Sequence, residues 1–285
     1  MPRILLATFQ LMPDGEPGGS TLLAALADRG VDAAWARWDD PAVDWSAADL
    51  VAVRSTWDYY RRASEFLAWT RTVGDRLLNG PDVIAWNADK AYLRDLSVAG
   101  VPTVPTELLD DASLVAGLGR ALEHWGTVVV KPRTGAGGVG VCVVASPADE
   151  RLEGLVAAPW IVQPLVESVR TTGETSVFVF GGSAVSQVLK VPGGGDDGDI
   201  RVNELYGGSS RAVVLTPEHT ALAESAVAAA AARHGRRIDY ARVDVLEHDG
   251  GLVVSELELI EPGLYLDVDP GNAERFADLV VDRLS

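Results

Sequence analysis

The sequence of 285 residues predicts an α/β protein with a parallel sheet near its N-terminus and antiparallel hairpins further along. Two observations lead there. Apolar runs at residues 4–8 and 31–38 enclose a helical segment, and the order strand, helix, strand is typical of a parallel unit. Two later pairs of apolar runs are separated only by Gly181-Gly182 and by Asp249-Gly250-Gly251, which predicts hairpins. The class is therefore α/β, with α+β character in the second half.

A first α/β domain is predicted over residues 1–83. After the first strand comes a loop rich in glycine and proline, and Ser20 then begins a helix that ends at Gly30, because glycine favours helix ends. Residues 50–54 give another apolar strand. Residues 65–77 repeat apolar side chains at the spacing of one helix face, which indicates a helix that covers this sheet.

A small central domain is predicted over residues 84–162. Helices are expected at residues 90–99 and 112–123. The apolar runs at residues 127–131 and 139–144 are joined by a glycine-rich turn, which predicts a hairpin.

The last domain is predicted over residues 163–285. It contains both later hairpins, an alanine-rich helix at residues 217–234 and a closing helix at residues 274–284. Alanine has the highest helix propensity, so the alanine-rich segment is expected to be regular helix.

The composition excludes some classes of partner. With 24 basic and 41 acidic residues the net charge is −17, and an acidic surface repels nucleic-acid phosphates. No run approaches 18 apolar residues, and the N-terminus lacks the apolar length of a signal peptide, so we expect no membrane contact and a cytoplasmic location. The single cysteine excludes an intrachain disulfide. The sequence leaves the oligomeric state open, a homo-oligomer included.

Three carboxylates are predicted to meet on the last hairpin. Arg242 and Asp244 alternate on one strand, and Glu256 and Glu258 alternate on the next, so each pair shares a face. Clustered carboxylates repel one another unless a cation joins them, and Mg²⁺ prefers oxygen ligands. We predict that Asp244, Glu256 and Glu258 hold Mg²⁺, with Arg242 adding a charge suited to phosphate. The alternative is a solvated outer face of the hairpin.

The glycine-rich segment from Gly135 to Gly140 matches the pattern GxGxxG. A dinucleotide site requires a helix after these glycines, whereas a strand is expected here. Between two strands, such a loop can close its backbone N–H groups over phosphates; the alternative is a plain mobile turn. Lys131 ends the preceding apolar strand, so its charge must reach water or an anion. With Lys90 and Lys190 it completes the lysines of the sequence, and each lies beside a motif.

These motifs resemble the ATP-grasp superfamily over roughly residues 84–270, and most closely its glutathione synthetase and glutamate-ligase branches. The resemblance implies an ATP-grasp fold with an N-terminal parallel-sheet domain, a small lid and a C-terminal antiparallel-sheet domain, and it implies ATP and Mg²⁺ as cofactors. It assigns to the nucleotide Lys90, Lys131, Gly135, Gly137, Gly138, Gln163, Leu165, Val166, Glu167, Glu174 and Lys190. Many members have Asn where Glu258 stands here, which adds a negative charge to the metal site.

The N-terminal segment Arg54-Ser55-Thr56-Trp57-Asp58-Tyr59 resembles the cycloserine-type cyclo-ligases that act on O-ureido-serine. Its position at the carboxyl end of a parallel strand is where open α/β sheets bind ligands. We therefore expect Arg54, Ser55 and Asp58 to contact the substrate. The resemblance adds Asn203 to the substrate set, and it implies that Arg201 and Arg242 stabilise the transferring phosphoryl group.

The function implied is an ATP- and Mg²⁺-dependent ligase that joins a carboxylate to an amine through an acyl phosphate. The expected substrate is a small amino-acid-like molecule, and an intramolecular cyclo-ligase of the cycloserine type is included. One alternative is a kinase-like phosphotransferase with the same ATP site. Another is a nucleotide-binding protein without catalysis.

Overall fold

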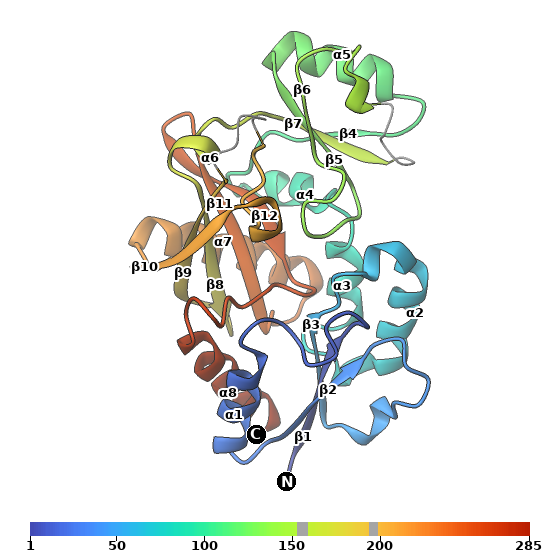
Figure 1. Ribbon diagram of the computed structural model, residues 1–285, viewed down its shortest axis with the longest axis vertical. Coiled ribbons are helices and arrows are strands. Elements are labelled where there is room, and N and C mark those ends of the chain that lie inside the picture. Colours follow the sequence, from blue (N-terminus) through green and yellow to red (C-terminus); the bar gives the residue numbers. More distant parts are fainter. Residues whose placement is uncertain (153–158, 194–198) are drawn as a thin grey trace.

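The computed structural model describes residues 1–152, 159–193 and 199–285. Its strands form three sheets, which follow one another along the long axis of the molecule (Figure 1). A parallel sheet lies at the end that holds both termini, an antiparallel sheet of five strands lies in the middle, and an antiparallel sheet of four strands lies at the far end. The predicted α/β class, with parallel strands first and antiparallel strands afterwards, is confirmed.

The first sheet has the order β2 (Asp32–Arg37), β1 (Arg3–Thr8), β3 (Leu50–Ser55), and all its strands are parallel. Helix α1 (Gly19–Asp28) follows β1, and α2 (Ala63–Val73) follows β3. The predicted helix at residues 65–77 ends early because Gly74 takes a positive φ of 64°, a conformation that stops an α-helix and suits glycine.

The C-terminal helix α8 (Gly271–Leu284) lies beside α1, so the two ends of the chain meet (Figure 1). It buries Phe276 and Val280, which are four residues apart and lie on one face. These side chains share a hydrophobic core with Ile4 of β1 and with Tyr240 of the central sheet. The first sheet is therefore packed onto the central part of the molecule over a continuous core.

The central sheet has five antiparallel strands. Their order is β10 (Ser209–Val213), β9 (Ser183–Val191), β8 (Glu174–Phe180), β11 (Tyr240–His248) and β12 (Gly251–Glu258). Both predicted hairpins are present. The edge strand β10 was not predicted, because it is mostly exposed and polar. Helix α7 (Pro217–His234) is capped by Thr216, whose side chain accepts from the N–H of His219. No described helix is long and apolar enough to cross a membrane.

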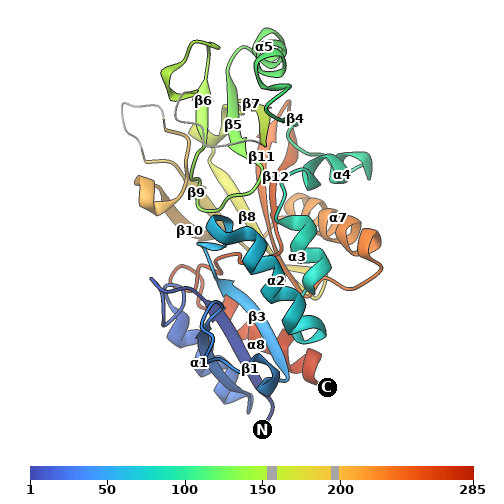
Figure 2. The ribbon, with the colours of Figure 1, turned by 90° about the vertical axis from the view of Figure 1, so that its right-hand side faces the viewer.

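Two short helices, α3 (Pro81–Asn87) and α4 (Tyr92–Val98), lie against α7 (Figure 2). Leu93 and Leu96 of α4 share a core with Ala226 of α7. The segment after residue 84 thus packs with the central sheet before the chain enters the four-stranded sheet. The helix predicted at residues 90–99 is confirmed as α4, and the separate helix α3 was not predicted.

The four-stranded sheet forms the far end of the molecule. Its order is β4 (Glu107–Leu109), β7 (Trp160–Pro164), β5 (Val128–Pro132) and β6 (Cys142–Val144), with α5 (Leu114–Trp125) on it. The predicted hairpin between β5 and β6 is confirmed. The second strand begins at Cys142 instead of residue 139, because Gly140 has a φ of 76° and still belongs to the turn. The predicted domain boundary at residue 162 falls inside β7.

Candidate active site

A cavity of about 830 Å³ opens where the three sheets meet. Its wall includes the loop after β1, the loop after β3, the glycine-rich turn between β5 and β6, and the facing ends of β9, β11 and β12. A volume of this size falls in the range of small-molecule and cofactor sites. Most residues that the sequence predicted for the site lie in this wall.

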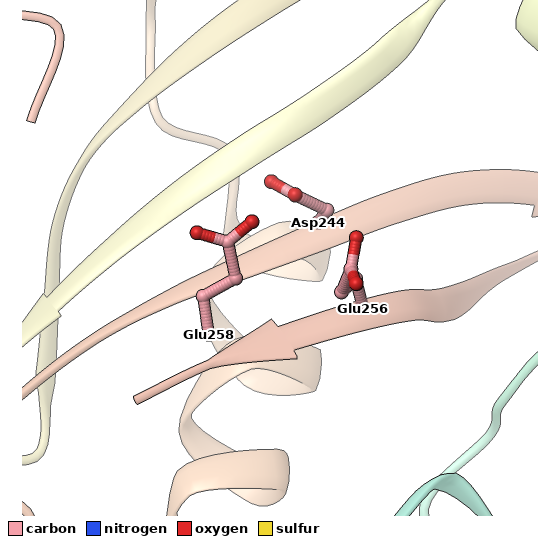
Figure 3. A group of neighbouring side chains, drawn as sticks. All are labelled: Asp244, Glu256 and Glu258. Atoms are coloured by element: carbon pink, nitrogen blue, oxygen red, sulfur yellow. The ribbon is translucent and has the colours of Figure 1, made fainter. Parts of the chain in front are cut away.

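The three predicted carboxylates lie together on β11 and β12. In the antiparallel register Asp244 is opposite Glu256, and Arg242 is opposite Glu258. One oxygen from each of Asp244, Glu256 and Glu258 lies within 4.8 Å of the others, and the side chains rise from the same face of the hairpin (Figure 3). The expected approach of these groups is confirmed, since alternation on paired strands leads to it.

Two cations lie against Asp244 of this cluster. Arg242 Nη2 donates to Asp244 Oδ2 at 2.8 Å and to Glu258 Oε1 at 2.5 Å. Lys190 Nζ lies 3.2 Å from Asp244 Oδ1. Burial opposes the charge of Asp244, but Arg242 and Lys190 hold the pKa of this carboxyl well below its usual value. Asp244 is therefore fixed as a carboxylate.

The pKa of Glu258 is shifted in the opposite direction. Burial raises the pKa of Glu258 to about 7, and the neighbouring charges of Asp244 and Glu256 add to this effect against Arg242. A cation bound between the three carboxylates would favour the ionised form of Glu258. Three carboxylates whose oxygens lie close together fit Mg²⁺.

The lysines take three different positions. Lys90 Nζ lies 2.6 Å from Glu256 Oε1 and donates to the carbonyl oxygen of Gly135 at 3.2 Å, so it joins the carboxylate cluster to the glycine-rich turn. Lys190 is buried between Asp244 and Glu174, whose Oε1 is 2.5 Å away. Lys131 lines the cavity, and no residue of the described ranges forms an ion pair with it. Its charge is available for an anion.

The glycine-rich turn reaches across the cavity to the loop before β10. Gly137 and Gly138 have φ values of 63° and 74°, which glycine adopts without strain. A side chain at Gly138 would meet Arg201 Cδ at 3.2 Å. The Arg201 guanidinium stacks 3.4 Å from the ring centroid of Tyr206 and pairs with Asp199 at 2.6 Å. Arg201 therefore faces the tip of this turn.

From β7 to the start of β8, all but one of the residues predicted for the nucleotide line the cavity. Gln163, Leu165 and Val166 line the cavity, as does Glu174. Glu174 is held by Lys190 and accepts from the hydroxyl of Ser255 at 2.9 Å. Glu167 is absent from the wall: its side chain is 65% exposed and pairs with Arg170. Of these two acids predicted for the nucleotide, only Glu174 lines the cavity.

The predicted substrate residues divide in the same way. Asp58 and Asn203 line the cavity, whereas Arg54 and Ser55 do not. Arg54 is fully buried, and its Nη2 donates to Glu16 Oε1 at 2.7 Å and to the carbonyl oxygen of Pro262 at 2.6 Å. Ser55 donates to the hydroxyl of Thr8 at 2.9 Å. The structure does not bring these two side chains to the cavity, because strand β3 is buried on both faces.

Glu261 is one of the cavity-wall residues that were missed in the sequence. Glu261 is 8% exposed and lines the cavity beside Trp57, whose indole N–H donates to the carbonyl oxygen of Glu261 at 3.2 Å. Burial and the charge of Glu258 raise the pKa of Glu261 to about 8. The signal was a charged residue inside the apolar run Leu259-Ile260-Glu261-Pro262. Glu261 lies beyond the end of β12, so the alternation of side chains along that strand did not indicate it.

The geometry can be compared with known proteins. Residues 4–79 match the family described as the N-terminal domain of D-cycloserine synthetase DcsG, and residues 99–265 match the RimK-like ATP-grasp domain. The cycloserine biosynthesis protein DcsG of Streptomyces lavendulae is 34% identical over 278 residues, which cover 92% of each protein.

Solved structures agree with this match. The crystal structure of D-cycloserine synthetase DcsG has a TM-score of 0.88 and 31% identity, and it covers 99% of this chain and 100% of that chain. The ATP-grasp ligase PsnB, solved with a minimal precursor, Mg and ADP, has a TM-score of 0.66 and 17% identity over 99% of this chain and 98% of that chain. The second likeness is one of fold.

Proposed function

The chain belongs to the RimK-like ATP-grasp ligases related to D-cycloserine synthetase DcsG, and on this premise we propose that it closes a cycloserine-type ring in antibiotic biosynthesis. The predicted ATP-grasp fold and ligase class are confirmed by the match. The observation that carries the proposal is the 34% identity over 92% of the chain, since it includes the N-terminal part as well as the ATP-binding part.

ATP-grasp ligases use ATP and Mg²⁺. Here we propose that Lys131, Lys90 and the backbone of the turn around Gly137 bind the phosphates. Lys131 supports this because no described residue pairs with it, and exposed backbone N–H groups suit anions. The adenosine would lie against Gln163, Leu165, Val166 and Glu174, all in the cavity wall.

The metal proposal rests on Asp244, Glu256 and Glu258, whose oxygens approach within 4.8 Å. Bound Mg²⁺ would neutralise charge on the phosphates during transfer. Arg242 and Lys190 pair with Asp244, and Lys90 pairs with Glu256, which favours the ionised form of these two carboxylates. Glu258 pairs with Arg242, but burial raises its pKa to about 7.

The proposed reaction has two steps. A carboxylate oxygen of the substrate attacks the γ-phosphorus of ATP, and the bond from this phosphorus to the bridging oxygen breaks. ADP departs, and the substrate becomes an acyl phosphate. A nitrogen of the same substrate then attacks the acyl carbon, loses a proton and expels phosphate. Arg242 and Arg201 would stabilise the charge of the phosphoryl group. The glycine-rich turn would exclude water, which otherwise hydrolyses the acyl phosphate.

The substrate we propose is an O-ureido-serine-like amino acid, in which carboxylate and nitrogen nucleophile belong to one molecule. Asp58 and Asn203 would take part in binding it, since both line the cavity. We also propose that the reaction takes place in the cytoplasm, where ATP is supplied.

The test is an assay of ADP and phosphate release with O-ureido-serine of both configurations beside ordinary amino acids, with mass spectrometry of the products. We expect equal amounts of ADP and phosphate and a cyclic product. A stable phosphorylated product without free phosphate would instead indicate a kinase-like phosphotransferase. ADP release at background with every compound would indicate a nucleotide-binding protein without catalysis.

A further inference from the structure

Glu261 is a buried carboxylate at the cavity wall that lacks a partner. It is 8% exposed, and it lines the cavity between the end of β12 and the loop after β3. Within residues 1–152, 159–193 and 199–285, no other residue donates a hydrogen bond to its carboxylate or forms an ion pair with it. A buried carboxylate is costly unless a cation or a donor meets it.

Every other buried or half-buried carboxylate in this wall has a cation. Among the buried ones, Glu16 pairs with Arg54, and Asp244 pairs with Arg242 and Lys190. The half-buried acids and their partners are Asp58 with Arg62, Glu174 with Lys190, Glu256 with Lys90 and Glu258 with Arg242. Glu261 is the exception in the described wall. Without a cation in contact, burial raises its pKa to about 8 and favours the neutral acid. A cationic group of a ligand beside it would favour the carboxylate.

Bound Mg²⁺ is a poor candidate for that cation. The oxygens of Asp244, Glu256 and Glu258 form the one group of acids in the described residues that lie mutually within 4.8 Å, and Glu261 is outside it. It lies three residues beyond Glu258, where the strand has ended.

The surroundings of Glu261 suit an organic ammonium. The indole of Trp57 donates to its carbonyl oxygen at 3.2 Å. Trp57 lines the same cavity, whereas Tyr59 is 4% exposed and the ring of Tyr265 lies against Arg242. An indole beside a carboxylate favours an ammonium group, since the ring quadrupole and the negative charge both attract a cation.

We propose that Glu261 binds the free α-ammonium group of the substrate and thereby selects amino acids over carboxylic acids that lack this group. This inference rests on the proposed function and adds the residue that recognises the α-ammonium group of the substrate. It has a chemical consequence. An ammonium held as a cation has no lone pair, so the α-nitrogen cannot attack the acyl phosphate. The nucleophile must be a second nitrogen, which is what ring closure requires.

The test compares two substrates on two proteins. The substrates are O-ureido-serine and its analogue without the α-amine, 3-(ureidooxy)propanoate, and kcat/KM for ADP release is measured. The wild type should prefer the amino compound by about 100-fold, because loss of one partner of a desolvated charge pair costs a few kcal/mol. In Glu261→Gln, which keeps the shape of the side chain, the preference should fall to less than about 5-fold. Glu261→Asp, which keeps the charge, should restore part of it.

Controls separate this role from its rivals. Glu247→Gln removes an exposed acid of β11 outside the cavity wall and should keep the full preference. An unchanged preference in Glu261→Gln would overturn the proposal. An equal loss with both substrates, or a shift in the Mg²⁺ concentration for half-maximal rate, would also overturn it, since either points to a base or a metal ligand.

Failure of the proposed function has a different signature. If the wild type releases no ADP with O-ureido-serine, the proposed substrate is wrong, and calorimetry then decides the ammonium site without turnover. Serine should bind the wild type more tightly than 3-hydroxypropanoate, and Glu261→Gln should abolish the difference. Equal binding of both compounds to the wild type would overturn the proposal.

Discussion

The two ends of the cavity are built in different ways. At the phosphate end, Asp244, Glu256 and Glu258 come from one hairpin, and their proximity follows from its register. At the other end, Arg54 from β3 reaches Glu16, 38 residues before it, and Pro262, 208 residues after it. Local pairing can be predicted from alternation, whereas contacts between distant segments depend on how the sheets pack. The first end is therefore predictable from sequence and the second is not.

The largest effect should come from Glu256→Gln, which tests the phosphate end. The change removes one carboxylate of the cluster and the partner of Lys90 at 2.6 Å. ADP formation should fall on the order of 10³-fold, as for loss of other electrostatic groups in active sites. Circular dichroism should show an unchanged fold, and Glu247→Gln serves as the matched control. Turnover close to that of the wild type would remove Glu256 from the proposed metal site.

Arg54→Met tests the other end. Glu16 would lose its partner at 2.7 Å while it remains 4% exposed, and breaking a buried pair costs roughly 3–5 kcal/mol. We expect a loss of stability of that size in urea unfolding. The double change Arg54→Met with Glu16→Gln should recover part of it, because no unpaired charge is then buried. Normal stability with a raised KM for the amino acid would instead make Arg54 a substrate contact.

The sequence predicted what periodicity and pairing determine. The parallel order of the first strands, both later hairpins and the β5–β6 turn followed from apolar runs and glycines. Short elements were missed where no pattern marks them: β4 has three residues and β10 is polar and exposed. In the site, the positions of the Ser55 and Glu261 side chains could not be predicted. Ser55 faces Thr8 inside the first sheet, and Glu261 reaches the cavity from an irregular loop beside Trp57.

Lys131→Ala gives a smaller effect and separates binding from folding. No described residue forms an ion pair with Lys131. Its loss should therefore leave the free energy of unfolding within about 0.5 kcal/mol of that of the wild type. The KM for ATP should rise by roughly 10- to 100-fold, because a charge-assisted contact to phosphate is lost. Lys190→Ala should behave differently and destabilise the protein, since it leaves Glu174 and Asp244 without their shared cation. Equal destabilisation by both changes would contradict the assignment.

The smallest effect on kinetics is expected from substitutions in the glycine-rich turn between β5 and β6, which lines the cavity. A Cβ at Gly138 would lie 3.2 Å from Arg201 Cδ, at a φ of 74°, so Gly138→Ala carries both strain and a close contact. At Gly137 the φ is 63° and no atom lies within 4 Å of a Cβ, so Gly137→Ala adds strain alone, of about 1–2 kcal/mol. Initial rates against ATP concentration should show a KM several-fold higher for Gly138→Ala and a smaller rise for Gly137→Ala. The difference between the two variants measures the contact with Arg201. If both variants lose stability while their KM for ATP stays that of the wild type, the turn does not cover the phosphates.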